Sequence, residues 1–514
     1  MPNTSAIDTS VLITILGLIA AVWAVVPSNT RLRFRLSMSW VDWVIAMSVF
    51  VIIHYLVFEP FFRSVGLYYS FGPWRGGLDK GSAVYLLLLG LGLYVLLRAR
   101  APKLAAGKLE TFEVLVSKLL LTRRYDELFT LIEPHLFKLF ELSNAHAPFF
   151  RKKWGGGIRV PSCSTLTKLK AKLQTKSGQA DRARDILKSI LNQPQFVAYL
   201  SVSHPHFCLR ILAVEEVVRE DFTELFVAAL INDSNSLLYS ELKNNQNLNG
   251  RHRLALPTSN RILHFLFSDV TTAERLALYQ PIGETVCRRI DEDPKLAEAY
   301  NLSMGYYNES GKYRCPIHAG IKLFEIMIHE AIHQGIQDHL WLFYFTHFTD
   351  KILKQLRDQQ PTDSLHEWPT PFHFLLYEIV TITSDWVEDF IDVKADSIAE
   401  HVRKQEGFDS QYISKQAADA LGRIVQSILA SPKIVDRFKG YLLEISLERY
   451  KRFQNRKDAN TVAHAFINAM IFGDEYTTKK GYRRELHRAF QDLDHVLRHD
   501  VESFGLGLER SLEE

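Results

Sequence analysis

The chain has 514 residues, of which 47% are hydrophobic, and its net charge at pH 7 is +3. This length allows a large core and more than one domain, and the charge is too small to identify a partner by itself. The cysteines are far apart and form no CxxC pair, which excludes a disulfide framework and a thiolate metal site and suits a cytosolic location. They are Cys163, Cys208, Cys287 and Cys315.

Three apolar runs near the N-terminus have the composition of transmembrane helices. They extend from Ser10 to Val26, from Val41 to Phe58 and from Ala83 to Leu97. Each has about 15 to 18 residues, and tryptophan or tyrosine lies in or beside each run, as at membrane interfaces. The residues before the first run include no lysine or arginine, so a cleaved signal peptide is not indicated. We therefore predict an anchor of three transmembrane helices in residues 1–103, in contact with the lipid bilayer.

The basic residues around these runs predict the orientation of the anchor. The N-terminus carries none, and the loop between the second and third runs carries three. The loop after the first run and the exit of the third run together carry seven, which are Arg31, Arg33, Arg35, Arg98, Arg100, Lys103 and Lys108. Cytosolic flanks are enriched in lysine and arginine. We expect a multi-pass protein of the inner (cytoplasmic) membrane, with its N-terminus outside and its C-terminal body in the cytosol.

The rest of the chain has helical periodicity, and we predict the all-α class. Residues 104–145 form an amphipathic pair of helices, a membrane-proximal hairpin. A loop from His146 to Ser164, rich in glycine, separates it from a helical cytosolic domain over residues 146–514. Only Ile158 to Val160 and Arg253 to Leu256 resemble strands, and no repeat occurs at a fixed period.

A strongly basic segment extends from Arg151 to Lys188. It contains eleven lysine or arginine residues against two aspartates, Asp181 and Asp185. Such a segment can contact anionic lipid headgroups or a nucleic acid backbone. No RNA- or DNA-binding motif accompanies the charge, so a nucleic acid partner is disfavoured. The remaining interpretation is a solvated helix face that nearby acidic residues balance.

The sharpest chemical signal lies in the stretch from Ile317 to Leu356. It lacks proline and carries apolar residues on almost every side, so we predict one long, buried, central helix. Inside it, residues 329–333 read HExxH. Side chains four apart share a helix face, so His329 and His333 could bind one zinc ion. Glu330 would then accept the proton of the zinc-bound water as general base.

This motif resembles the signature of zincin-type metallopeptidases, a resemblance that covers about ten residues. A zincin needs a third ligand. His339 occupies the last position of the HExxHxxGxxH pattern, but the turn-making glycine is displaced and a straight helix turns His339 away. The alternative is a glutamate from a second helix, for which Glu388, followed by Asp392, is the first choice and Glu378 the second.

Two functional hypotheses follow from the sequence. The first is an integral-membrane zinc metallopeptidase that acts on a protein substrate. The second is a non-enzymatic membrane-anchored sensor, scaffold or effector, in which HExxH is a packing feature and the body binds a protein or an anionic ligand. In outline this layout resembles membrane-anchored stress or phage-defence effectors of bacteria. The sequence does not indicate an oligomeric state.

Overall fold

Helices are the regular elements of the structure. This computed structural model describes residues 36, 38–69, 80–100, 104, 106–144, 178–214, 219–244, 256–304, 311–336, 342–358, 368–393, 398, 400–404, 408–456, 459–473 and 480–513. Within these ranges there is no strand, and the predicted all-α class is confirmed. The first apolar run, the loop 146–164, most of the two possible strands and residues 151–177 of the basic segment lie outside the described residues.

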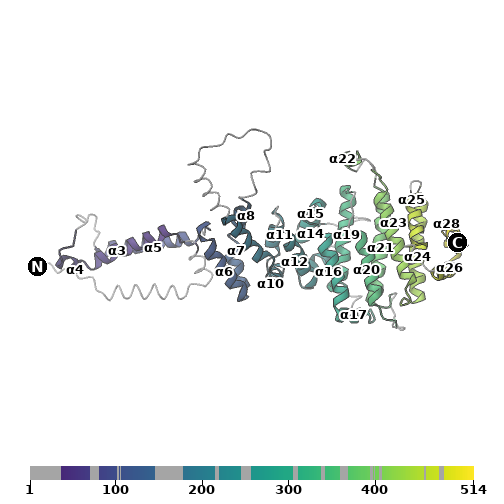
Figure 1. Cartoon of the computed structure of the whole chain (residues 1–514), viewed down its shortest axis with the longest axis horizontal. Helices are drawn as coiled ribbons and strands as arrows, with labels where there is room; N and C mark the ends of the chain where they lie inside the picture. Colours follow the sequence, from purple (N-terminus) through teal and green to yellow (C-terminus); the bar gives the residue numbers. More distant parts are fainter. Residues whose placement is uncertain are drawn as a thin grey trace. The chain divides into compact units, whose positions relative to one another are not determined.

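The chain divides into two compact units, Met1–Phe196 and Val197–Glu514 (Figure 1). The first contains a helix at residues 178–191 besides α3 (Trp40–Val57), α4 (Glu59–Ser64), α5 (Lys80–Arg100), η1 (Ala106–Lys108), α6 (Leu109–Leu121), α7 (Tyr125–Ile132) and α8 (Leu136–Asn144). Helix α10 (Pro194–Ser203) crosses the boundary. The second unit continues with α11 (Pro205–Leu212), α12 (Arg219–Asn232), α13 (Leu237–Asn244), α14 (Arg261–Phe267), α15 (Val270–Arg275), α16 (Tyr279–Glu292), α17 (Pro294–Tyr300), η3 (Gly311–Arg314), α19 (Pro316–Gln334), α20 (Leu342–Gln355), α21 (Pro371–Ile391), α22 (Glu400–Arg403), α23 (Tyr412–Ala430), α24 (Asp436–Gln454), α25 (Asn460–Ile471), α26 (Lys480–Gln491), α27 (His495–Asp500) and α28 (Glu502–Glu513).

Helices α3 and α5 form an antiparallel hairpin. Near one end Tyr94 donates a hydrogen bond to the buried carboxylate of Asp42, and near the other Ile53 and Leu56 pack against Val84. Helix α3 is long and apolar enough to cross a membrane, whereas the apolar part of α5, Gly81–Val95, is shorter. The described residues therefore contain one candidate membrane span, and the prediction of three transmembrane helices is not confirmed.

The second unit stacks its longer helices in two layers. Helices α16, α20, α23 and α25 contact one another in succession, and so do α19, α21 and α24. Each of these helices also packs against its neighbours in the other layer. This is the arrangement of helical repeat proteins, in which each hairpin contacts mainly the next.

The expected single helix from Ile317 to Leu356 is wrong. Helix α19 ends at Gln334, because Gly335 adopts a left-handed conformation with φ of 71°. The N–H of Ile336 then donates to the carbonyl of Ala331 at 2.9 Å, which satisfies an end of the helix. Glycine in this conformation can end a helix even where the sequence has no proline. The HExxH motif therefore lies at the C-terminal end of α19 rather than in the interior of a helix.

Candidate functional site

The HExxH residues occupy the last turns of α19 and face three different environments. Glu330 is buried, with 2% of its surface exposed, whereas His333 is exposed to solvent. His329 lies between these extremes and faces α21. The apolar residues before the motif, such as Met327 and Ile328, are buried in the core. The predicted burial is therefore confirmed for the part of α19 that precedes the motif.

Glu330 belongs to a hydrogen-bond network that holds the end of α19. Its carboxylate accepts a hydrogen bond from the Gln334 side chain at 3.3 Å. The same Gln334 amide donates to the carbonyl of Ser268 at 3.2 Å and accepts from the N–H of Val270 at 3.1 Å. The proposed general base is therefore linked through Gln334 to the start of α15.

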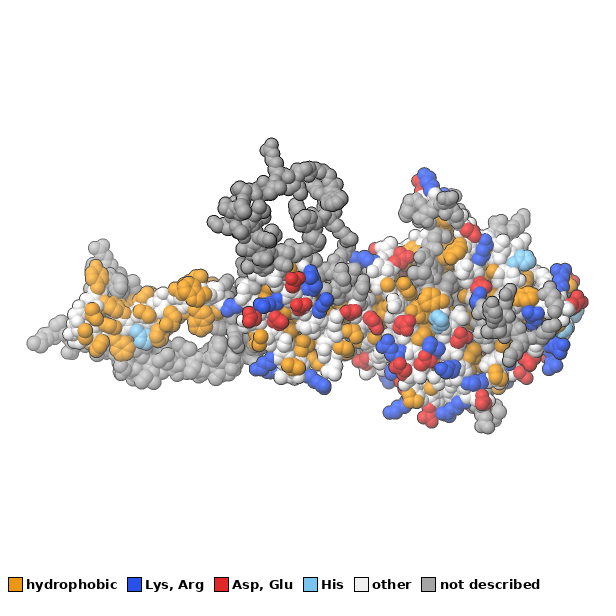
Figure 2. All heavy atoms as spheres, in the orientation of Figure 1, with side chains coloured by type: hydrophobic (Ala, Val, Ile, Leu, Met, Phe, Trp, Pro, Cys, Tyr) orange, Lys and Arg blue, Asp and Glu red, His pale blue; other side chains and the backbone are white. Residues whose placement is uncertain are grey.

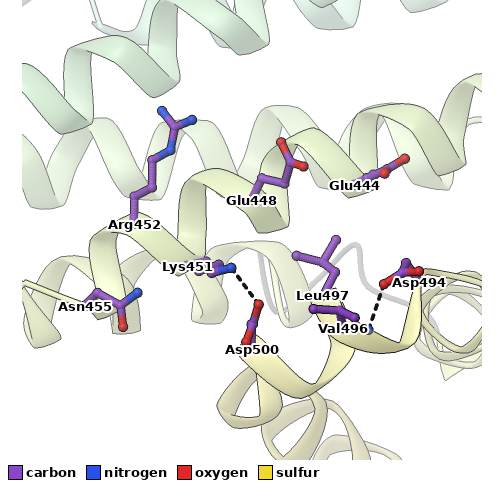
Figure 3. Close-up of a pocket in the computed structure, with 9 residues that line it drawn as sticks. All are labelled: Glu444, Glu448, Lys451, Arg452, Asn455, Asp494, Val496, Leu497 and Asp500. Carbon is purple, nitrogen blue, oxygen red and sulfur yellow. Dashed lines mark hydrogen bonds and ion pairs between the residues drawn. The ribbon is translucent and has the colours of Figure 1, made fainter.

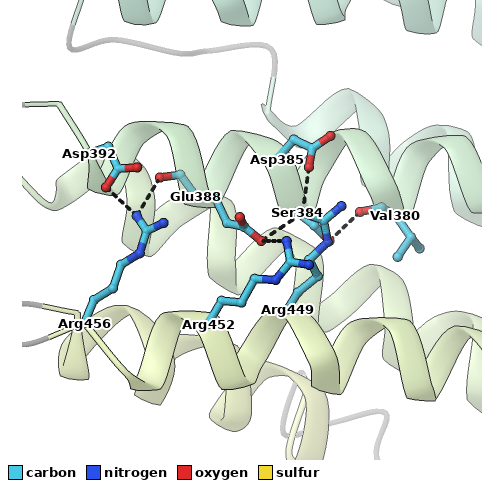
Figure 4. Close-up of polar contacts among 8 residues, drawn as sticks. All are labelled: Val380, Ser384, Asp385, Glu388, Asp392, Arg449, Arg452 and Arg456. Carbon is cyan, nitrogen blue, oxygen red and sulfur yellow. Dashed lines mark hydrogen bonds and ion pairs between the residues drawn. The ribbon is translucent and has the colours of Figure 1, made fainter. Parts of the chain in front are cut away.

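His329 and the predicted third ligand, Glu388, have different partners. The Nδ1 atom of His329 lies 3.7 Å from Oδ2 of Asp389 on α21. Glu388 precedes Asp389 and therefore points about 100° away around the helix. It accepts a hydrogen bond from Arg449 of α24 at 2.9 Å (Figure 4). The structure thus brings Asp389, rather than Glu388, to the motif.

The other candidate ligands are also engaged elsewhere. Glu378 pairs with Lys322 at 3.0 Å, and Asp392 pairs with Arg456 at 2.5 Å. His339 lies outside the described residues. Among the residues that the structure describes, no three histidine, cysteine, aspartate or glutamate side chains are grouped to hold a metal ion. These residues do not fit a three-ligand zinc site around His329 and His333.

Helix α21 instead presents acidic residues on two faces, which sequence reasoning missed. One face, with Glu378 and Asp389, meets α19. The other meets α24 in a charge ladder whose members are Asp385, Glu388, Asp392, Arg449, Arg452 and Arg456 (Figure 4). The acidic members and the basic members are both spaced by three and then four residues. They pair in the same order along the chain, from Asp385 with Arg449 to Asp392 with Arg456, so the two helices run parallel. That matched spacing is the sequence signal that could have predicted this pairing.

A buried cluster fastens the middle of α19 to α21. Burial lowers the pKa of His318 to about 3, so its imidazole is neutral at pH 7. Burial alone would lower the pKa of Lys322, but the carboxylates of Glu325 and Glu378 outweigh it and raise the pKa. Burial would raise the pKa of Glu378, but the positive charges nearby, foremost that of Lys322, outweigh burial and lower it. The lysine and glutamate therefore stay charged as a pair, beside a neutral histidine.

An open groove of about 500 Å³ lies between α24 and α27 (Figure 3). Lys451 in its wall pairs with Asp500 at 2.6 Å. Glu444 and Glu448 are one turn apart on the same wall, and neither has an ion pair or hydrogen bond with another described residue. Val496 on the opposite wall is 65% exposed. The groove is lined by four carboxylates, Glu444, Glu448, Asp494 and Asp500, against two cations, Lys451 and Arg452, and its apolar members are Val496 and Leu497. It is therefore acidic on balance.

No protein-family model, no curated protein and no solved structure matches this chain.

Proposed function

We propose that the protein is a membrane-anchored, non-enzymatic scaffold whose helical body binds a protein partner. The proposed membrane anchor rests on the exposed apolar surface of the α3–α5 hairpin, where Trp40 is 79% exposed. Figure 2 shows hydrophobic side chains gathered over this hairpin. The exposed members are Trp40, Val41, Trp43, Val44, Ile45, Met47, Phe50, Val51, Ile52, Tyr85, Leu86, Leu89, Leu93 and Leu97. A water-soluble protein rarely exposes so large a contiguous apolar patch, whereas lipid would cover it favourably.

The polar groups of the hairpin support this role. Asp42 accepts hydrogen bonds from the N–H and hydroxyl of Ser39, at 2.6 and 2.7 Å, and from the hydroxyl of Tyr94. The carboxylate therefore caps the start of α3 and has its partners within the hairpin. Buried polar groups near a bilayer need such internal partners, because lipid supplies none.

The groove between α24 and α27 supports binding to a basic protein segment. A lysine or arginine side chain could place its charge beside Glu444 and Glu448 and its aliphatic stem against Val496. Helical stacks commonly bind proteins through extended surfaces of this kind.

The anchor is tested by washing membranes that contain the full chain with alkaline carbonate. We expect the wild type to stay in the pellet. Replacing Leu86, Leu89 and Leu93 by lysine should lower the fraction of protein in the pellet, since charged residues are costly in lipid and α3 is then the intact part of the hairpin. Matched lysine substitutions at the exposed Leu302, Val435 and Leu506 of the helical body should not. Recovery of the wild type in the supernatant would refute the anchor.

The binding site is tested with a fluorescent peptide that alternates arginine and leucine. We expect the detergent-solubilised full chain to bind it, and the double variant Glu444→Gln/Glu448→Gln to bind at least about tenfold more weakly. The control is Glu485→Gln/Glu509→Gln, which removes two other carboxylates of the second unit. Equal affinity of wild type and groove variant would count against this site.

The zinc hydrolase remains a separate hypothesis that rests on the motif alone. We expect protein prepared without chelator to hold no stoichiometric zinc, because no three ligand side chains are grouped to hold a metal ion among the described residues. Plasma mass spectrometry of the wild type and His333→Ala tests this. Zinc that is present in the wild type and lost in the variant would overturn the non-enzymatic proposal.

A further inference from the structure

Helix α6 packs through one face and exposes apolar residues on the other. Its buried face contains Leu109, Phe112, Leu115, Val116 and Leu119. On the opposite face Val114 is 63% exposed and Leu121 is 86% exposed. These two residues are seven apart, so they lie on one stripe of the helix, with the exposed Ser117 and Lys118 between them.

An open groove of about 580 Å³ runs along this stripe. Its lining includes Val114 and Leu121 of α6 and Arg182 of the helix at residues 178–191. Arg182 approaches Glu110 at 3.4 Å and Glu113 at 3.7 Å. The groove is thus apolar along α6 and charged at its rim, a shape that suits a second amphipathic helix.

The charges along the exposed stripe are asymmetric. At the N-terminal end of α6, Glu110 and Glu113 outnumber the single charge of Arg182. Lys118 lies in the second half of α6, and Arg123 and Arg124 follow its end, where, among the described residues, only Arg124 has an acidic partner, Glu127. The side chain of Lys118 has no ion pair with another described residue. If α6 of a second copy runs antiparallel to this helix, its acidic end lies over the basic end of this helix. Its basic end then lies over the acidic end of this helix. The stripe is therefore complementary to itself under a two-fold rotation.

We propose that α6 pairs antiparallel with α6 of a second copy of this chain. Val114 of each copy then contacts Leu121 of the other, and Lys118 lies about one helical turn from Glu113 of the other copy, within reach of its long side chain. Two chains in one membrane also meet at a high effective concentration, which allows so small a contact to persist. The pairing goes beyond the proposed function, which requires no dimer.

The register of this pairing predicts which engineered cysteines can be cross-linked. If residue 114 lies opposite residue 121, the two-fold axis passes between residues 117 and 118. Ser117 of one copy then lies beside Ser117 of the other, within disulfide reach. The two copies of residue 110 are about 20 Å apart along the helices. A parallel pair would instead bring both positions within reach.

The experiment oxidises single-cysteine variants of the full chain in native membranes. The background is Cys163→Ser, because Cys208, Cys287 and Cys315 are buried. We expect Ser117→Cys to give a disulfide-linked dimer and Glu110→Cys to give none. Absence of the Ser117→Cys dimer, or equal dimers from both variants, would overturn the proposal.

A second set of variants separates pairing from folding and from anchoring. Adding Val114→Lys and Leu121→Lys should reduce the Ser117→Cys dimer at least about tenfold, because two charges then enter the contact. The matched control Val202→Lys, at another exposed valine, should leave the dimer unchanged. All variants should stay in the carbonate-washed pellet, so a failed anchor and a failed dimer are distinguishable. An undiminished dimer in the double lysine variant would contradict the assigned contact.

Discussion

His373 at the start of α21 is a fully buried imidazole with one hydrogen bond. Its Nδ1 atom lies 2.8 Å from the hydroxyl of Thr370, while Nε2 has no hydrogen-bond partner among the described residues. The ring meets Phe438 of α24 edge to face. Burial lowers the pKa of His373 to about 4, so the folded protein holds it neutral at pH 7.

This histidine predicts acid sensitivity. In the unfolded state, His373 has its ordinary pKa of about 6.5 and is protonated below that pH. In the folded state the same imidazole is protonated only below about pH 4, so between these values protonation favours the unfolded state. Stability is therefore fully present above pH 6.5 and falls as the pH drops through this window, by about 3 kcal/mol at most. His373→Asn keeps a polar group beside Thr370 but does not titrate. We expect urea unfolding to show a smaller loss between pH 7 and pH 4 in the variant. Parallel losses would contradict the role of His373.

At the scale of elements, the contact between α23 and α25 depends on a missing side chain. A Cβ atom at Gly422 would lie 2.6 Å from Cβ of Ala469 and 2.7 Å from the carbonyl oxygen of Phe466. Backbone atoms cannot move aside cheaply, so the helices would separate. Gly440 of α24 has nothing within 4 Å of the same position. The two glycines form a matched pair for experiment.

We expect Gly422→Ala to lower the unfolding free energy by about 2 kcal/mol, through overpacking. Gly440→Ala should raise it by up to about 1 kcal/mol, because alanine favours the helix and meets no obstacle. Thermal unfolding of both variants in detergent provides the measurement. The same sign of change at both positions would show that the close approach at Gly422 does not matter.

The ladder between α21 and α24 predicts energetic coupling between distant residues. Glu388 and Arg449 are both largely enclosed and 2.9 Å apart. In a double-mutant cycle with Glu388→Gln and Arg449→Met we expect a coupling of about 1 kcal/mol. The exposed pair Glu400 and Lys404 is the control and should show almost none. Absence of coupling between Glu388 and Arg449 would mean that their ion pair adds no stability and that apolar packing alone holds α21 against α24.

At the scale of the whole molecule, the expected orientation in the membrane can be tested with thiol labelling. The positive charges predict that the connection between α3 and α5 is outside and the helical body is inside. In the Cys163→Ser background, Ser64→Cys should react with an impermeant maleimide in intact cells. Ser189→Cys should react only after permeabilisation; both serines are exposed in the structure. Labelling of Ser189→Cys in intact cells would reverse the predicted topology.

The sequence by itself determined the helical class and the apolar character of α3 and α5. Helical periodicity and hydropathy are properties of neighbouring residues, so they can be read without a fold. The end of α19 at Gly335 is also a local signal, because glycine adopts the left-handed conformation that stops a helix even where proline is absent. The prediction of a continuous helix therefore failed for a reason present in the sequence.

Only the tertiary structure decided the partners of the charged side chains. Glu388 and Asp389 are adjacent in sequence, yet one meets α24 and the other meets α19, because α21 packs between these helices. Similarly, Glu241 of α13 accepts the N–H groups of Ile262 and Leu263 and caps α14 from another helix. Spacing along one helix fixes which side chains share a face. It does not fix which helix that face meets, because this depends on contacts between residues far apart in the chain.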